Sequence, residues 1–236
     1  MDFTWTALIP GVGHEKAHVA TAGIVSGLMI MTAVVARARL GRGEEAVMPS
    51  AKFSLRGFFE IIVEYIQNLS NMVIGHHGEK FLPMFTTIFF FILINNFVGI
   101  LPGMAPATEN INTTIALGGF SFVMYNYYGF KENGLAYLKH FLGPVIWLAF
   151  LMLPIELISH LARPLSLGLR LANVMGGDHR VVGVFLDIFG WGLPIPFYLL
   201  GMFIAFIQAF VFTLLSMVYV SMATAHDQKK KKKHDQ

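Results

Sequence analysis

The segment "PIELISHLARPLSLGLRLANVMGGDH", residues 154–179, combines membrane-length apolar character with a row of polar side chains. These side chains recur at intervals of three and four residues, so on a helix they fall within an arc of roughly 140°. They are Glu156, Ser159, His160, Arg163, Ser166, Arg170 and Asn173. Ionisable groups at membrane depth are costly and normally face a bundle interior or a water-filled path. The stretch therefore predicts a membrane helix with a functional polar stripe.

The composition supports a membrane location for the rest of the chain. Of 236 residues, 55% are hydrophobic and 13% are charged, whereas a soluble domain carries roughly 25% charged residues. The fold class predicted is an all-α polytopic membrane protein. The absence of cysteine excludes disulfides and cysteine-based metal or redox chemistry. No cofactor, metal or nucleic-acid partner is predicted, and the sequence holds no nucleotide-binding loop.

Five membrane-length segments are predicted within a single membrane domain, 1–236. They cover residues 17–36, 81–101, 113–128, 143–189 and 194–225. The fourth is too long for one perpendicular span, so we expect a long helix that is tilted or kinked. Residues 54–75 form an amphipathic pattern, which fits either an interfacial helix on the membrane surface or a helix packed on neighbouring spans. The basic residues 226–236 are predicted to be a disordered tail.

The distribution of positive charge predicts the orientation. Lysines and arginines follow the first segment, lie between the third and fourth, and follow the fifth. The opposite loops, 102–112 and 189–194, contain neither residue type. The positive-inside rule then places the N-terminus outside and the C-terminus in the cytoplasm. The expected location is the plasma (inner) membrane of a bacterium.

Arg170 is the residue whose position demands a function. Its guanidinium stays charged at any accessible pH, whereas a buried lysine can lose its proton. No acid follows it in sequence before Asp178, so we expect its partner elsewhere, on another chain. Snorkelling to the interface suits Arg163, which lies nearer the cytoplasmic end, better than it suits Arg170. Interhelical hydrogen bonding of the whole stripe is the alternative.

Titratable groups lie on both sides of Arg170. Asp178 and His179 follow it by about two turns, and a carboxylate with an imidazole can relay protons at physiological pH. Alternatively, Asp178 pairs with Arg180 or caps local backbone. Glu156 precedes Arg170, so a fixed positive charge separates two proton-handling zones, as two non-continuous half-channels require. In the last segment Gln208 is the strongly polar residue at mid-depth, and its amide could hold Arg170 or form a structural interhelical hydrogen bond.

One motif near the N-terminus matches a different chemistry. "HEKAH", residues 14–18, fits the H-E-x-x-H pattern of zinc hydrolases. That chemistry needs a helix, a third ligand and a closed site, whereas the motif precedes the first membrane segment and follows two nearby glycines. A membrane-embedded metalloprotease is therefore a weak alternative.

These motifs resemble subunit a of the F-type ATP synthase, the stator channel subunit beside the rotating c-ring. The resemblance is carried by residues 154–179 and by "IQAFVFTLLSMVYVSMA", residues 207–223. "TTIFFFILINNFVGILPG" and "ATENINTTIALG" add support, and the likeness runs from about Arg56 to Ala225.

The resemblance implies roles for individual residues. Arg170 corresponds to the family's essential arginine, Gln208 to its glutamine of the last helix, and Glu156 to its cytoplasmic-side acid. Ser166 and Arg163 match its flanking polar positions.

Two positions depart from the family pattern. The family's asparagine four residues after the arginine is replaced by Val174, and Asn173 comes one residue earlier. A titratable residue of the last helix is replaced by Gly201, so Asp178 is expected to take over its function.

The resemblance also implies a mechanism. Protons would enter past Asp178 and His179, protonate a carboxylate of the c-ring, and leave on the Glu156 side, while Arg170 blocks direct leakage. The partners implied are c-ring subunits, the b subunits of the peripheral stalk and the lipid bilayer, and ATP chemistry would belong to other subunits. The chain would thus not be an enzyme by itself. The main alternative is a stand-alone ion-coupled transporter in which Arg170 binds an anionic substrate.

Overall fold

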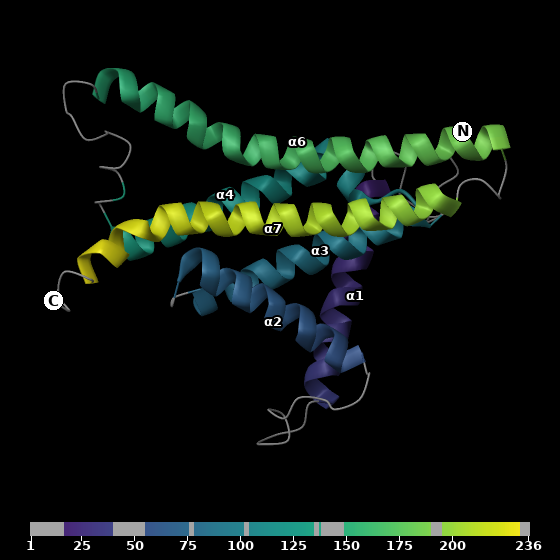
Figure 1. Ribbon diagram of the computed structural model, residues 1–236, viewed down its shortest axis with the longest axis horizontal. Helices are drawn as coiled ribbons and strands as arrows, with labels where there is room; N and C mark the ends of the chain where they lie inside the picture. Colours follow the sequence, from purple (N-terminus) through teal and green to yellow (C-terminus); the bar gives the residue numbers. More distant parts are fainter. Residues whose placement is uncertain are drawn as a thin grey trace.

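The computed structural model describes residues 17–39, 55–75, 78–101, 104–134, 137, 149–189 and 195–231. Within these ranges the regular structure is helical (Figure 1). The elements are α1 (Ala17–Arg39), α2 (Leu55–Ile74), the 3-10 turn η4 (Gly78–Phe81), α3 (Leu82–Ile100), the 3-10 turn η5 (Ala107–Glu109), α4 (Ile111–Asn133), α6 (Ala149–Phe189) and α7 (Ile195–Lys231). The predicted all-α membrane class is confirmed.

The two longest helices, α6 and α7, run antiparallel, and α1 crosses steeply to them (Figure 1). α7 packs against α3 and α4, and α6 packs mainly on α4. With 41 residues, α6 is about 60 Å long, roughly twice the thickness of the hydrocarbon core. It must therefore tilt strongly or extend beyond the core. It also contains Pro154 and Pro164, which remove backbone donors and bend helices.

Local signals fix the ends of α4, which positions the site. The side chain of Asn110 accepts a hydrogen bond from the backbone N–H of Asn112 and caps the first turn. At the other end Gly134 takes φ of 54°, a backbone conformation that favours glycine, and the helix stops. We name the two ends of the bundle after residues at the ends of α4. The Glu109 end lies beside Ile111, and the Glu132 end lies beside Asn133.

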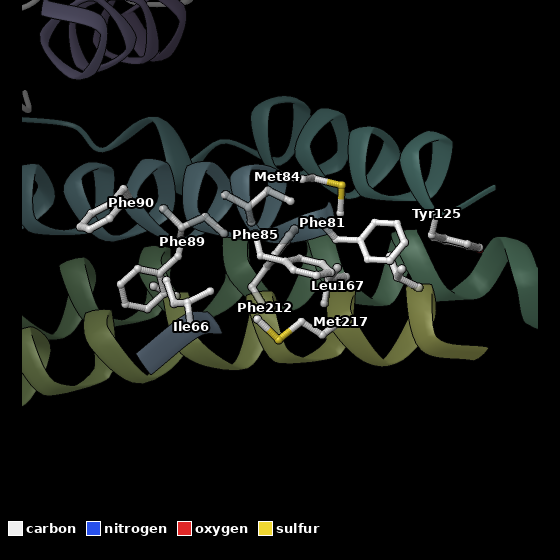
Figure 2. Packing of buried hydrophobic residues seen from close by; sticks show 14 of the residues in the cluster. Ile66, Phe81, Met84, Phe85, Phe89, Phe90, Tyr125, Leu167, Phe212 and Met217 are labelled. Carbon is white, nitrogen blue, oxygen red and sulfur yellow. The ribbon is translucent and has the colours of Figure 1, made fainter. Parts of the chain in front are cut away.

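The core is aromatic and lies between α3 and α7 (Figure 2). The buried side chains come from α2, α3, α4, α6, α7 and the turn η4, and include Ile66, Phe81, Phe85, Phe89, Phe90, Tyr125, Leu167, Phe212 and Met217. Phe81 and Tyr128 meet edge to face, with ring centroids 4.6 Å apart, a geometry that aromatic pairs prefer. This cluster joins α3, α4 and α7 and leaves the far side of α6 open.

α4 and α6 approach closely because glycines face each other. A Cβ on Gly118 would lie 2.5 Å from the carbonyl oxygen of Pro164, and one on Gly168 would lie 2.8 Å from that of Thr114. Small residues permit such contacts between membrane helices. Gly177 of α6, by contrast, has nothing within 4 Å of its Cβ position.

Buried polar side chains link the other helices. Asn96 of α3 donates to the carbonyl of Ala205 in α7 at 3.2 Å and accepts from Thr108 at 2.7 Å. Ser121 of α4 donates to Ser216 of α7 at 2.9 Å. Such bonds satisfy groups that find no water in a membrane. They fix α7 against both α3 and α4.

Four helices of the described residues are long and apolar enough to cross a membrane: Ala17–Arg37, Gly78–Ile100, Phe150–Phe185 and Ile195–Thr224. They coincide with the first, second, fourth and fifth predicted segments. α4 occupies the predicted third segment, but its many polar residues leave it outside this set. The number of spans therefore stays a prediction.

Two further predictions meet the structure at α2 and α7. α2 buries Ile66, Ser70 and Ile74 and packs against α3 and α7, as in the second alternative for residues 54–75. The first part of the predicted disordered tail, residues 226–231, is instead helical, because α7 continues to Lys231. Extending an existing helix is easier than nucleating one, and Ala, Gln and Lys are good helix formers. Residues 232–236 lie outside the described ranges.

Candidate functional site

The polar residues of α6 do not all lie on one surface. Ser159, Ser166, Arg170 and Asn173 are exposed, Glu156 and Arg163 are half-buried, and His160 is buried. The four exposed residues define a face that we call the open face of α6. On the packed side, Leu167, Gly168 and Leu171 lie against α4 and the core. The predicted stripe is thus divided between an open face and a contact with α4.

Arg170 lies on the open face at mid-length of α6. No carboxylate of the described residues lies within ion-pair distance of its guanidinium. Leu165 and Leu169 beside it are also exposed. A permanently charged group surrounded by exposed leucines fits a surface that another membrane component covers.

Gln208 of α7 lies at nearly the same level as Arg170. Asp178 of α6 lies against Gly201 of α7, and the two helices run antiparallel from there. Arg170 is then about 12 Å along α6 and Gln208 about 10 Å along α7. Gln208 is buried, and its amide forms no hydrogen bond with Arg170 in the part of the chain that the structure describes. The predicted direct contact is therefore not made here.

Asp178 fills the space above a glycine of the neighbouring helix. A Cβ on Gly201 would lie 2.5 Å from Oδ2 of Asp178 and 3.4 Å from Oδ1. Gly201 is buried and Asp178 is half-buried. The carboxylate thus occupies the volume that a side chain at position 201 would need. The alternative pairing of Asp178 with Arg180 is not among the ion pairs of the described residues.

Glu109 is a site residue that the sequence analysis did not single out. Its Oε2 lies 3.2 Å from Nδ1 of His179, and its Cγ lies 3.4 Å from the Cβ position of Gly176. η5 brings it there because Thr108, which precedes it, is fixed to Asn96. The sequence signal that could have identified it is its charge, because Glu109 is the one charged residue of the 102–112 loop.

The departure at positions 173 and 174 also has a structural consequence. Asn173 is exposed on the open face, whereas Val174 packs against the hydrophobic core. One residue along a helix turns a side chain by about 100°. The amide therefore faces the same side as Arg170, and the core keeps an apolar residue.

At the Glu132 end, a second polar group includes Glu156 and Arg163. Arg163 Nη2 lies 3.8 Å from Glu156 Oε1, and its guanidinium carbon lies 5.7 Å from the ring centroid of Tyr219. A cation over an aromatic face is favourable. Arg163 therefore lies between α6 and α7 with its charge partly compensated.

The zinc-hydrolase motif finds no structural support in the described residues. His14, Glu15 and Lys16 lie outside the described ranges, and His18 lies in the first turn of α1. Within those ranges no group of three or more His, Asp or Glu side chains is placed to hold a metal ion.

The fold and site define a polytopic helical membrane protein in which one long helix carries an exposed arginine with titratable groups on both sides of it. Comparison with known proteins identifies the family. The ATP synthase A chain family matches residues 19–221. The chain therefore belongs to that family and is a membrane component of an ATP synthase.

Relatives from several bacteria agree with this assignment. "ATP synthase subunit a" of Bdellovibrio bacteriovorus is 60% identical, over 96% of this chain and 100% of the relative. "ATP synthase subunit a" of Geotalea uraniireducens is 44% identical, over 70% and 72%. "ATP synthase subunit a 1" of Syntrophotalea carbinolica is 42% identical, over 87% and 85%. The resemblance found in the sequence is confirmed, and it assigns the chain to ATP synthesis and ion transport.

Proposed function

We propose that this chain forms two offset half-channels that pass protons to and from a carboxylate on the c-ring. Arg170 is the fixed barrier charge between them. The observation that carries the proposal is the exposed position of Arg170, with no carboxylate of the described residues as its ion-pair partner. A cation that must exchange partners at each rotation step would be blocked by a permanent acid of its own chain.

The outer half-channel would lie at the Glu109 end. Glu109, His179 and Asp178 form a titratable group that reaches from η5 to α7. Asp178 supplies the carboxylate in the volume beside Gly201, where a side chain of α7 would otherwise lie. Carboxylate and imidazole groups in a wet cavity relay protons near neutral pH.

The inner half-channel would lie at the Glu132 end. Glu156 is the acid that accepts the released proton, and its partial exposure leaves it accessible. Ser159 and Ser166 supply hydroxyl groups along the open face on this side of Arg170, and Asn173 supplies an amide on the other side, toward the Glu109 end. His160 belongs to this end of the path but is buried.

Gln208, at the level of Arg170, keeps a polar group of α7 beside the barrier charge. In this proposal the c-ring covers the open face.

The remaining assignments concern the surroundings of the chain. We place it in the bacterial inner membrane, with the Glu109 end outside, the C-terminus in the cytoplasm, and the b subunits of the peripheral stalk and the lipid bilayer around it. It binds no nucleotide and is not catalytic alone. Membership of the ATP synthase A chain family favours this assembly over a stand-alone ion-coupled transporter.

The test is Arg170→Ala in inverted membrane vesicles that contain the whole synthase. ATP-driven proton pumping is expected to be lost, because no fixed charge then releases the ring carboxylate. Arg37→Ala, which removes an exposed arginine of α1, is the matched control and should pump normally. Coupled pumping by the Arg170→Ala variant would refute the proposal.

A further inference from the structure

His160 is the first buried residue of α6 in the described structure. Every described residue from Phe150 to Ser159 is exposed or half-buried, whereas His160 is 6% exposed. The next buried position is Leu167, close to the glycine contact with α4. The N-terminal turns of α6 therefore join the bundle at His160.

The imidazole of His160 is held by two residues of α4. Its Nε2 lies 3.0 Å from Oδ1 of Asn126 and 3.2 Å from Oη of Tyr125. Its ring also meets the rings of Tyr125 and Phe122 edge to face, each at 5.2 Å. Tyr125 is 1% exposed, so these contacts are removed from solvent.

The hydrogen bonds show which ring nitrogen of His160 carries a hydrogen. The Nδ2 of Asn126 donates to the carbonyl of Phe122 at 2.7 Å, which orients the amide and leaves Oδ1 toward His160. Since an amide oxygen only accepts, Nε2 of His160 must carry a hydrogen. Oδ1 accepts a second hydrogen bond, from Oη of Tyr137 at 3.0 Å.

Tyr137 makes this second bond from outside the helices. It is 5% exposed and packs on α4 at Gly129, where a Cβ would lie 2.8 Å from its ring. Burial raises the pKa of its hydroxyl, and the positive charge of Arg163 partly opposes this rise. The hydroxyl therefore stays a proton-bearing donor in the physiological pH range.

The same face of α6 carries the two charged residues of the Glu132 end, Glu156 and Arg163. Glu156 and Arg163 lie four residues before and three residues after His160, so all three share one side of α6. The ring of Tyr219, over which Arg163 lies, is 6.0 Å from that of Tyr125. A change in the position of His160 would therefore move both the carboxylate of Glu156 and the guanidinium of Arg163.

We infer that His160 is a positioning residue, whose bond to Asn126 and Tyr125 sets the rotation of the N-terminal turns of α6. It thereby fixes Arg163 between α6 and α7, and Glu156 beside Arg163. His160 thus supports the proton path by holding α6 in place, without itself carrying a proton. This role rests on the proposed function only where it assigns Glu156 to the inner half-channel.

The test compares two substitutions of His160 in the whole synthase. His160→Gln keeps a donor close to the position of Nε2 but cannot titrate, and His160→Leu leaves Oδ1 of Asn126 with one bond fewer. ATP-driven pumping per assembled complex should stay within about twofold for His160→Gln, with an unchanged pH profile, and fall about tenfold for His160→Leu. Leu161→Ala, an exposed neighbour, is the control. A loss in His160→Gln equal to that in His160→Leu would make His160 a proton carrier and overturn the inference.

A second readout is independent of proton flow. The chain contains no cysteine, so Arg163→Cys supplies a single thiol. Its reaction rate with a water-soluble reagent reports how accessible position 163 is. The rate should rise severalfold when His160→Leu is added and stay unchanged with His160→Gln. Equal rates in all three backgrounds would overturn the inference. A changed rate with normal pumping in the His160→Leu single variant would uphold the positioning and refute the place of Glu156 in the path.

Tyr125→Phe is a milder variant that tests the same contact if the His160→Leu chain fails to assemble. It removes one hydroxyl while keeping the ring contacts with Phe122, Tyr219 and His160. We expect pumping to fall about two- to threefold and the Arg163→Cys thiol to react faster. Unchanged values for both quantities would contradict the role given to Tyr125.

Discussion

The two faces of α6 differ in what surrounds their polar groups. On the face toward α4, His160 is buried and hydrogen-bonded, and Gly168 permits backbone contact. On the open face, Arg170 and Ser166 are exposed, with leucines around them. On one face of α6 the buried polar group therefore forms hydrogen bonds within the chain. On the other face the charge of Arg170 has no ion-pair partner among the described residues.

The difference shows that polar residues in a membrane helix fall into two kinds. Those satisfied within the chain hold the helix in place, as interhelical bonds do in other bundles. Those left exposed at membrane depth indicate a partner or a water-filled path. Substitutions on the packed face should therefore act through the assembly or the placement of α6, and those on the path should act directly on proton flow.

The largest effect is expected on the packed face. Gly168→Val would force side-chain atoms into the backbone of Thr114 and Ile115, which lie 2.8 and 3.0 Å from the Cβ position. Overpacking of this kind typically costs about 1–3 kcal/mol, and more where backbone must move. We expect little of the chain to co-purify with the synthase. Gly183→Val, at a position with nothing within 4 Å, is the control; equal loss in both variants would contradict the importance of the close contact between α4 and α6.

The next effect concerns Asp178 and its place beside Gly201. Asp178→Asn should lower ATP-driven pumping about a hundredfold, since loss of a proton-transfer group typically costs 10²–10⁴-fold. Gly201→Asp alone should also fail, because the new side chain would collide with Asp178. The double variant Asp178→Gly with Gly201→Asp should recover pumping in part. Normal proton flux in Asp178→Asn would end the role given to this carboxylate.

A smaller effect is expected at Glu109. Glu109→Gln keeps a hydrogen-bonding group beside His179 but removes the negative charge that strengthens the contact. Pumping should fall about two- to fivefold, because the amide stabilises a protonated imidazole less well. Glu64→Gln, an exposed acid of α2, should pump normally. An unchanged rate in Glu109→Gln would remove this residue from the outer half-channel.

Much of the architecture could be predicted from the sequence. Apolar length located α1, α3, α6 and α7, and the spacing of polar residues identified α6 as the helix that carries the site. The predicted end of the chain was less accurate, since α7 continues as helix to Lys231. Local composition does not show how far an existing helix propagates.

The sequence could not show which polar residue faces which neighbour. Ser159 and His160 are adjacent and both belonged to the predicted stripe, yet one is exposed and the other is buried. Helical periodicity gives angles within α6, whereas the rotation of α6 depends on long-range contacts such as that between Gly118 and Gly168. The approach of Glu109 to His179, across 70 residues, depends on the same packing.

The most direct test of the open face is disulfide cross-linking to the c subunit. Single cysteines replace Ser166, Asn173 or, as a buried control, Ala172, and each is paired with cysteines placed along the c-subunit helix that carries the carboxylate. We predict cross-links from positions 166 and 173, at c-subunit positions close to that carboxylate, and none from position 172. Cross-links from position 172 alone, or from none of the three, would contradict the claim that Arg170 faces the ring.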